Sequence, residues 1–129
     1  MVKILKLNTG EEVTGEFVML KDDSVVLKRP MTIVYRFHPL SSYPSVKLVK
    51  YMIFSKEDTF EFKHSDIVNN TYAREAFVEY YTHVLESFDN KMDESIDEEL
   101  RNAIKQDKNI KNKFYENLLE QMPTPKNVN

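Results

Sequence analysis

Three histidines are the first residues of this chain whose type could do chemistry, because imidazole is a common metal ligand. They are His38, His64 and His83. Their spacing matches no metal-ligand pattern, and the chain has no cysteine that could complete a zinc site. His83 lies among polar residues in a helical pattern, so we interpret it as a surface histidine. The sequence predicts no metal site.

A run of five carboxylates is the second candidate, because oxygen ligands suit calcium. The run comprises Asp93, Glu94, Asp97, Glu98 and Glu99. An EF-hand loop requires a glycine at a fixed position, which this run lacks. Carboxylates also stabilise the positive N-terminal end of a helix. We therefore interpret the run as a solvated helix start.

Enzymatic chemistry has no support in the sequence. No Ser-His-Asp, phosphate-loop or dinucleotide pattern is present, and two glycines cannot form a glycine-rich phosphate cradle. The lack of cysteine excludes a thiol nucleophile. We predict a protein that is not an enzyme and uses no cofactor.

Length and composition predict one globular domain. With 129 residues, 41% hydrophobic and 30% charged, the chain can bury a core and does not have a disordered composition. No apolar run reaches the roughly 18 residues that span a bilayer, and the N-terminus lacks the apolar segment of a secretory signal. We expect a cytoplasmic protein without a membrane partner.

The formal net charge of -3 is unevenly distributed. Residues 1–68 hold ten Lys or Arg and nine Asp or Glu, a net charge of +1. Residues 69–129 hold eight and twelve, a net charge of -4. The total argues against a protein that coats nucleic acid by bulk electrostatics. The first part is nevertheless the better candidate for binding an anionic ligand.

Hydrophobic periodicity in the first half of the chain predicts five β-strands separated by turn-favouring residues. Their ranges are residues 2–7, 12–20, 25–35, 46–54 and 59–68. The loop at 37–45 contains two prolines and three serines, and a polar turn occupies 55–58.

Three features of these strands predict a strongly bent sheet. Gly15 falls inside the second strand, where a glycine permits a sharp bend or a close approach of backbones. Val25, Val26 and Leu27 form a continuous apolar run, which indicates a strand covered on both faces or a strand in a strongly bent sheet. Pro30 removes one hydrogen-bond donor, so we expect one-sided pairing or a bulge there.

The periodicity becomes helical after Asn70-Thr71. An aromatic-rich stripe over 72–88 predicts a first helix. Ser95-Ile96-Asp97-Glu98 has the spacing of a capping box, so we expect a second helix from Ser95. A further apolar stripe over 110–122 predicts a third helix, which ends before two prolines. We expect residues 126–129 to be frayed.

The second and third strands carry a recognisable pattern. Val13-Thr14-Gly15-Glu16-Phe17, the acidic turn at Asp22-Asp23 and Val25-Val26-Leu27-Lys28 combine a hydrophobic-glycine-hydrophobic unit, an acidic turn and an apolar strand. This pattern resembles the first motif of the Sm-like superfamily, which includes Sm, Sm-like and bacterial host-factor (Hfq) proteins. The resemblance covers about residues 2–68. Placing the helices after the strands, together with VKLVKYMIF at 46–54, is similar to small Sm-like proteins attributed to cyanophages, a group of bacteriophages, and marine metagenomes.

The resemblance implies a mainly β fold with an α appendage. We expect an Sm-like, five-stranded, strongly bent antiparallel sheet, which forms an open barrel, followed by C-terminal helices. The corresponding division is an Sm-like β domain at 1–68, a helical extension at 69–125 and a tail at 126–129.

The resemblance also implies a homo-oligomeric ring of five to seven subunits, in which the fourth strand pairs with the fifth strand of the neighbour. Closing a ring pairs strand edges that would otherwise be open to aggregation. The expected interface residues are Val46, Leu48, Met52, Ile53, Phe60 and Phe62. The alternative is a monomer whose helices cover its edges.

Single-stranded RNA rich in uridine or adenine is the ligand that the resemblance implies, bound at the pore of the ring. Phe62-Lys63-His64 is similar to the host-factor signature. The expected RNA-binding residues are Lys63 and His64, with Asp23 and Ser24 from the acidic turn.

Two registers are open for Lys63 and His64. In one register both side chains face the pore. In the other, the fifth strand begins at Thr59, both are strand residues, and the pore loop contains residues 56–58. The alternative function is a phage-type structural or protein-interaction ring without a nucleic-acid ligand.

Overall fold

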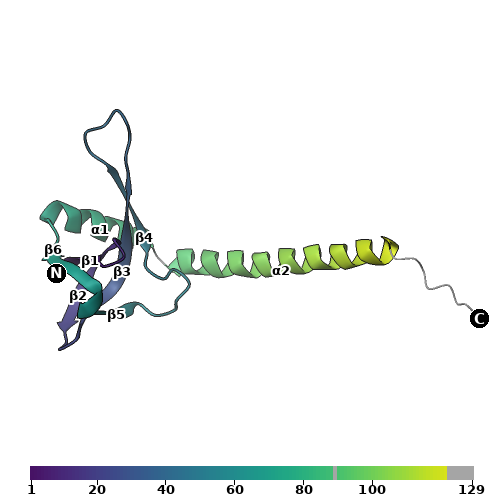
Figure 1. The fold of residues 1–129 in the computed structure, drawn as a ribbon, viewed down its shortest axis with the longest axis horizontal. Coiled ribbons are helices and arrows are strands. Elements are labelled where there is room, and N and C mark those ends of the chain that lie inside the picture. Colours follow the sequence, from purple (N-terminus) through teal and green to yellow (C-terminus); the bar gives the residue numbers. More distant parts are fainter. Residues whose placement is uncertain (89, 122–129) are drawn as a thin grey trace, which may run out of the picture. The chain divides into compact units, whose positions relative to one another are not determined.

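The computed structural model describes residues 1–88 and 90–121 of the chain. The fold is mainly β, with an open antiparallel sheet of six strands and two α-helices at the C-terminal end (Figure 1). The strands are β1 (Val2–Leu7), β2 (Glu12–Leu20), β3 (Ser24–Arg36), β4 (Ser45–Lys50), β5 (Thr59–Lys63) and β6 (Ile67–Tyr72). The helices are the 3-10 turn η1 (His64–Asp66), α1 (Glu75–Ser87) and α2 (Asn90–Gln121).

Strand β3 organises the sheet because it has two successive partners along one edge. Its first half, 24–28, pairs with β5, and its second half, 31–36, pairs with β4. On its other edge β3 pairs with β2, and the order continues through β1 to β6. Pairing with two different strands along one edge requires a bend between the two halves of β3.

The bend lies at Arg29 and Pro30, where the register between β2 and β3 shifts opposite Gly15. Arg29 has a φ of 50°, and its side chain donates two hydrogen bonds to Glu16, at 2.8 and 3.2 Å. A Cβ on Gly15 would lie 3.1 Å from Leu27 Cβ and 3.2 Å from Pro30 Cα. The close approach of backbones predicted at Gly15 and the irregular pairing predicted at Pro30 are therefore confirmed.

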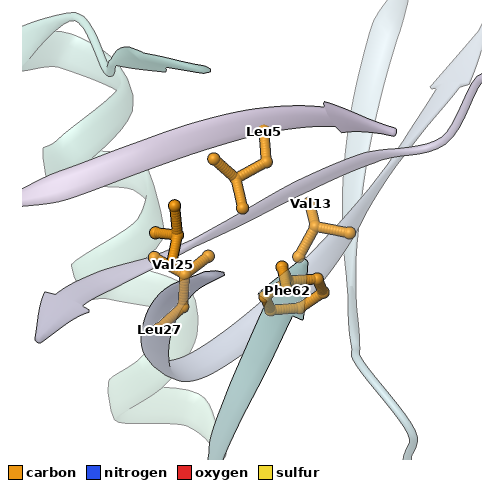
Figure 2. Packing of buried hydrophobic residues seen from close by; sticks show 5 residues of the cluster. All are labelled: Leu5, Val13, Val25, Leu27 and Phe62. Atoms are coloured by element: carbon orange, nitrogen blue, oxygen red, sulfur yellow. The ribbon is translucent and has the colours of Figure 1, made fainter. Parts of the chain in front are cut away.

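The centre of the core is a cluster of side chains from four strands, β1, β2, β3 and β5 (Figure 2). Its members are Leu5, Val13, Val25, Leu27 and Phe62. Because the sheet bends, its strands enclose these side chains on a single apolar face. Val26 is buried as well, so the run from Val25 to Leu27 is covered on both faces, as predicted.

Helix α1 contributes to this core. Tyr81 is 1% exposed, and its hydroxyl donates a hydrogen bond of 2.6 Å to the backbone carbonyl of Arg29, at the bend. The hydroxyl of Tyr80 donates to the carbonyl of Val46 in β4, at 3.1 Å. The helix is therefore attached to the sheet at two points.

The division of the chain differs from the predicted one. The sequence placed a boundary after Val68, whereas the structure forms two compact units, Met1–Ser87 and Phe88–Asn129. The physical reason is that β6 extends the sheet to Tyr72 and α1 packs on it. The predicted tail at 126–129 and the end of the extension at 125 lie outside the described residues.

Two predicted strands have different ends. The strand predicted over 46–54 ends at Lys50, because residues 51–54 form a turn in which the Ser55 amide donates to the Met52 carbonyl at 2.8 Å. The strand predicted over 59–68 is divided by η1 into β5 and β6. Residues up to Tyr72 belong to β6 because they pair with β1, so the first helix begins at Glu75 instead of after Thr71.

The second and third predicted helices are one helix, α2, of 32 residues. Ser95 lies inside it, so the predicted capping box does not start a helix there. The residues between the two apolar stripes contain no glycine or proline, and nothing interrupts the helical period. The end of the third stripe, at Met122, lies outside the described residues.

Candidate functional site

Two turns meet at one end of the sheet and form what we call the turn end. The first turn, at Lys21 to Asp23, connects β2 to β3, and the second is the corner where β5 enters η1. The His64 amide donates to the carbonyl of Asp23 at 2.8 Å, and Ser24 pairs with Lys63 across β3 and β5. The four residues predicted as RNA-binding thus lie together.

The structure gives the strand bounds on which the two registers differ. The strand does begin at Thr59, but it ends at Lys63, and His64 is the first residue of η1. Both Lys63 and His64 are exposed. Lys63 is therefore a strand residue, whereas His64 lies in the turn that follows the strand. The pattern of apolar residues over 59–68 did not show that the strand ends at Lys63 and is followed by a 3-10 turn.

Ser24 differs from its predicted role. It is 2% exposed, and its hydroxyl has no hydrogen-bond partner among the described residues. Its carbonyl instead accepts a 2.8 Å hydrogen bond from the Lys21 amide, which closes the β2–β3 turn. Its backbone therefore closes the turn, and its side chain is not on the surface for a ligand.

The charges at the turn end are mainly acidic. The carboxylates are Asp22, Asp23, Glu61 and Asp66, and the amines are Lys21 and Lys63. Lys21 forms an ion pair with Glu61, so part of its charge is neutralised locally. One copy of this end is therefore a weak site for phosphate groups.

A pocket of about 410 Å³ opens beside Lys63. It is lined by Leu7, Asn8, Thr9, Tyr51, Glu61, Phe62, Lys63 and Asp66. The Tyr51 ring packs against the rings of Phe60 and Phe62, with centroids 5.3 and 5.1 Å apart. An aromatic ring, an amide and an amine around one pocket can hold a planar heterocycle and an anionic group. The sequence did not indicate Tyr51, because it fell inside a predicted strand.

The predicted interface residues divide into two groups. Leu48 and Phe62 are buried in the core of this chain, so their apolar character needs no partner subunit. Val46 and Met52 are exposed, and Ile53 and Phe60 are half-buried. Met52, Ile53 and Phe54 line a shallow pocket of about 560 Å³ that follows β4.

Three described strands, β4, β5 and β6, are paired along one edge only. Unpaired edges of this kind favour pairing with another chain.

The other candidates from the sequence do not converge on a site. No group of three metal-ligating side chains forms within 1–88 and 90–121, where the histidines and the acidic run of α2 lie. His38 Nε2 lies 3.4 Å from the Ser45 hydroxyl, and His83 lies exposed on α1. Among the described residues, no helix combines the length and the apolar character needed to cross a membrane.

Comparison with protein-family models gives no match to this chain, and comparison with curated proteins gives none either.

Proposed function

We propose that this chain assembles into a homo-oligomeric ring that binds single-stranded RNA at the turn end. One observation carries the proposal: the backbone contact between His64 and Asp23 places the Lys63-His64 pair on the surface beside the acidic turn. The resemblance of Phe62-Lys63-His64 to the host-factor signature supports the same ligand. The ligand is uridine- or adenine-rich RNA, and the ring has five to seven subunits.

Ring closure is supported by the strand edges. β5 and β6 follow each other around η1, and each has one edge that no described strand covers. In a head-to-tail ring, the β5 edge of one subunit pairs with the β6 edge of the next, which covers two of the three open edges. Met52 and Phe54, both exposed, supply apolar surface for that contact.

The roles at the turn end follow from the side-chain chemistry. The Lys63 amine binds a phosphate, and His64 binds a base edge or a phosphate. The Tyr51 ring in the adjoining pocket can contact a base. Each single site is weak because of the carboxylates, but a ring presents several copies to one strand and gains avidity.

A protein-interaction ring without RNA is the second candidate, and the excess of carboxylates at the turn end favours it. Four acidic residues against two amines suit a basic protein partner better than a phosphate backbone.

Two measurements test the proposal in order. Native mass spectrometry gives the number of subunits, and a monomer at micromolar concentration would remove the ring. Met52→Lys should dissociate the ring, because it places a charge in an apolar contact.

RNA binding is then measured by titration against oligo-uridine and oligo-adenosine over a range of salt. Lys63→Ala should weaken binding similarly for both sequences and lower the salt slope by about 0.7, the value for one phosphate contact with a single strand. His64→Ala should weaken binding as well. Lys113→Ala is the matched control, because Lys113 is an exposed lysine on α2 and should have no effect. A wild-type ring with no affinity for either RNA would leave the protein-interaction function.

A further inference from the structure

The segment from Ser24 to Lys56 contains no Asp or Glu in a chain that holds 21 of them. It carries six cations, which are Lys28, Arg29, Arg36, Lys47, Lys50 and Lys56. Arg29 is paired with Glu16. The acid-free segment includes the end of β3, the start of β4 and the loop between them, which together we call the β3–β4 hairpin (residues 34–47).

This hairpin extends beyond the rest of the sheet, as Figure 1 shows above the β3 and β4 labels. Three large apolar residues at its tip are almost fully in solvent. Phe37 is 80% exposed, Tyr43 is 81% exposed and Leu40 is fully exposed. The loop is nevertheless ordered by local contacts, since the Ser41 amide donates to the His38 carbonyl at 3.1 Å and the Ser41 hydroxyl to the Tyr43 carbonyl at 2.8 Å.

The register of the hairpin separates its two faces. Val34 pairs with Lys47 and Arg36 with Ser45, so Arg36 and Lys47 lie diagonally on one face, and both are exposed. Alternation places Tyr35 and Val46 on the opposite face.

That opposite face continues the core and is already in contact with the protein. The pair next to Tyr35 and Val46 consists of the buried residues Ile33 and Leu48. The Tyr35 hydroxyl donates to Glu12, the one carboxylate with a described contact to the hairpin. The face with Arg36 and Lys47 is therefore the free and cationic one.

We infer that the β3–β4 hairpin is a binding surface for single-stranded RNA, in which Arg36 and Lys47 contact phosphates and the rings of Phe37 and Tyr43 stack on bases. A cationic track beside exposed rings is what single-strand binding requires. Local hydrogen bonds hold the backbone between the two rings, which lowers the entropy cost of ordering the tip on binding. The inference rests on the proposed function for the class of ligand, but it requires neither the ring nor the turn end.

Charge favours the hairpin over the turn end as the main phosphate contact. The turn end has more carboxylates than amines, whereas the hairpin has Arg36, Lys47 and His38 and no carboxylate of its own. An anionic membrane is less suited to the tip, because Leu40 is flanked by Pro39 and Ser41 and the apolar area is small for interfacial anchoring.

The test is binding of the full chain to labelled oligo-uridine and oligo-adenosine over a range of salt. The double variant Arg36→Gln, Lys47→Gln should lower the salt slope by about 1.4, at about 0.7 for each lost phosphate contact. Phe37→Ala should weaken binding by about 5- to 150-fold, the range for one stacked base. Because the substituted residues are exposed, the variants should keep the circular dichroism spectrum of the wild type and its number of subunits in native mass spectrometry.

The matched controls are on α2: Lys105→Gln with Lys113→Gln removes the same charge, and Phe114→Ala removes another exposed ring, at 62% exposure against 80% for Phe37. They should leave binding unchanged. Equal losses in the hairpin and control variants would overturn the inference, as would hairpin variants that bind like the wild type. The inference would also be overturned if the full chain bound no RNA but sedimented with phosphatidylserine vesicles in a way that depended on Leu40.

The outcomes separate this inference from the proposed function. Loss of binding in Lys63→Ala and His64→Ala with retention in the hairpin variants supports the turn end and rejects the hairpin. The reverse pattern supports the hairpin and rejects the turn end. A wild-type chain that binds neither RNA rejects both.

Discussion

Helices α1 and α2 are both amphipathic, and they differ in what their apolar residues contact. α1 buries Tyr81 in the core and binds two backbone carbonyls of the sheet. In α2 none of the residues with described burial is buried, and Leu100, Ile104 and Phe114 are exposed. An apolar stripe at helical spacing therefore predicts a helix without saying whether a core lies beneath it.

Composition explains part of this difference. The stripe of α1 is rich in tyrosine and phenylalanine, whose large area makes burial favourable. α2 alternates charged residues with its apolar ones over 32 residues, and an ion pair between Lys111 and Asp107 lies along its surface. Intrahelical pairs of this kind and good helix formers support α2 locally.

The largest expected effect comes from removing each helix. Deletion of residues 73–129 should leave the sheet unfolded, because Tyr81 is part of the core. Deletion of 88–129 should leave the melting temperature of the sheet unchanged, since every buried hydrophobic residue described lies within 1–87. Thermal melting followed by circular dichroism measures both. A cooperative transition for residues 1–72 at the temperature of the longer chain would show that α1 is dispensable.

A single substitution should reproduce much of that loss. Tyr81→Ala removes a fully buried ring and should lower the free energy of unfolding by about 3–5 kcal/mol, as for other buried aromatic residues. Denaturant titration measures the change. Tyr80→Ala is the control on the same helix, because Tyr80 is 37% exposed and should cost much less. Equal losses of stability for the two variants would show that Tyr81 is not the main contact between α1 and the sheet.

The bend beneath α1 should be sensitive to one methyl group. Gly15→Ala places a Cβ 3.2 Å from Pro30 Cα and 3.3 Å from the Lys28 carbonyl, and backbone atoms cannot move aside easily. We expect a loss of about 1–3 kcal/mol, the usual cost of overpacking. Denaturant titration of the variant checks this. An unchanged midpoint would mean that β2 and β3 can move apart at the bend without a loss of stability.

The hydroxyl of Tyr81 should give stability a dependence on alkaline pH. Burial raises the pKa of Tyr81 well above its ordinary value of 10.0, the negative charge of Glu16 adds to this, and Arg29 opposes it. Because the folded pKa lies above the unfolded one, the contribution is full below pH 10 and is lost as the pH rises further.

Tyr81→Phe should therefore cost about 0.5–1.5 kcal/mol at neutral pH for the lost hydrogen bond, and stability should fall less steeply above about pH 10. Some dependence should remain, because burial and the hydrogen bond to Glu12 raise the pKa of Tyr35 to about 12. Denaturant titrations at several pH values measure this, and identical slopes for wild type and variant would exclude a titrating Tyr81.

The smallest effect is expected on α2. Ile104→Ala should change the free energy of unfolding by less than about 0.5 kcal/mol, because Ile104 is 55% exposed and alanine is a good helix former. The same titration applies. A loss of several times that size would reveal that a partner covers this face, and would reduce the contrast between the two helices.

Local signals in the sequence were enough for much of the strand domain. Gly15 and Pro30 marked the bend, and the run from Val25 to Leu27 marked a strand covered on both faces, because such residues constrain their own backbone or burial. The Lys63-His64 pair and the turn at Asp23 were also visible in the sequence as separate features.

Tertiary structure decided which of these features meet. No local pattern shows that η1 interrupts the predicted strand over 59–68, that residues up to Tyr72 pair with β1, or that His64 contacts Asp23, because these contacts join residues far apart in the chain. The same holds for the helices: periodicity gave their apolar faces, while the burial of Tyr81 depends on a bend in β3 more than fifty residues earlier. Pairing and burial are properties of the folded chain as a whole, so a single stretch of sequence cannot specify them.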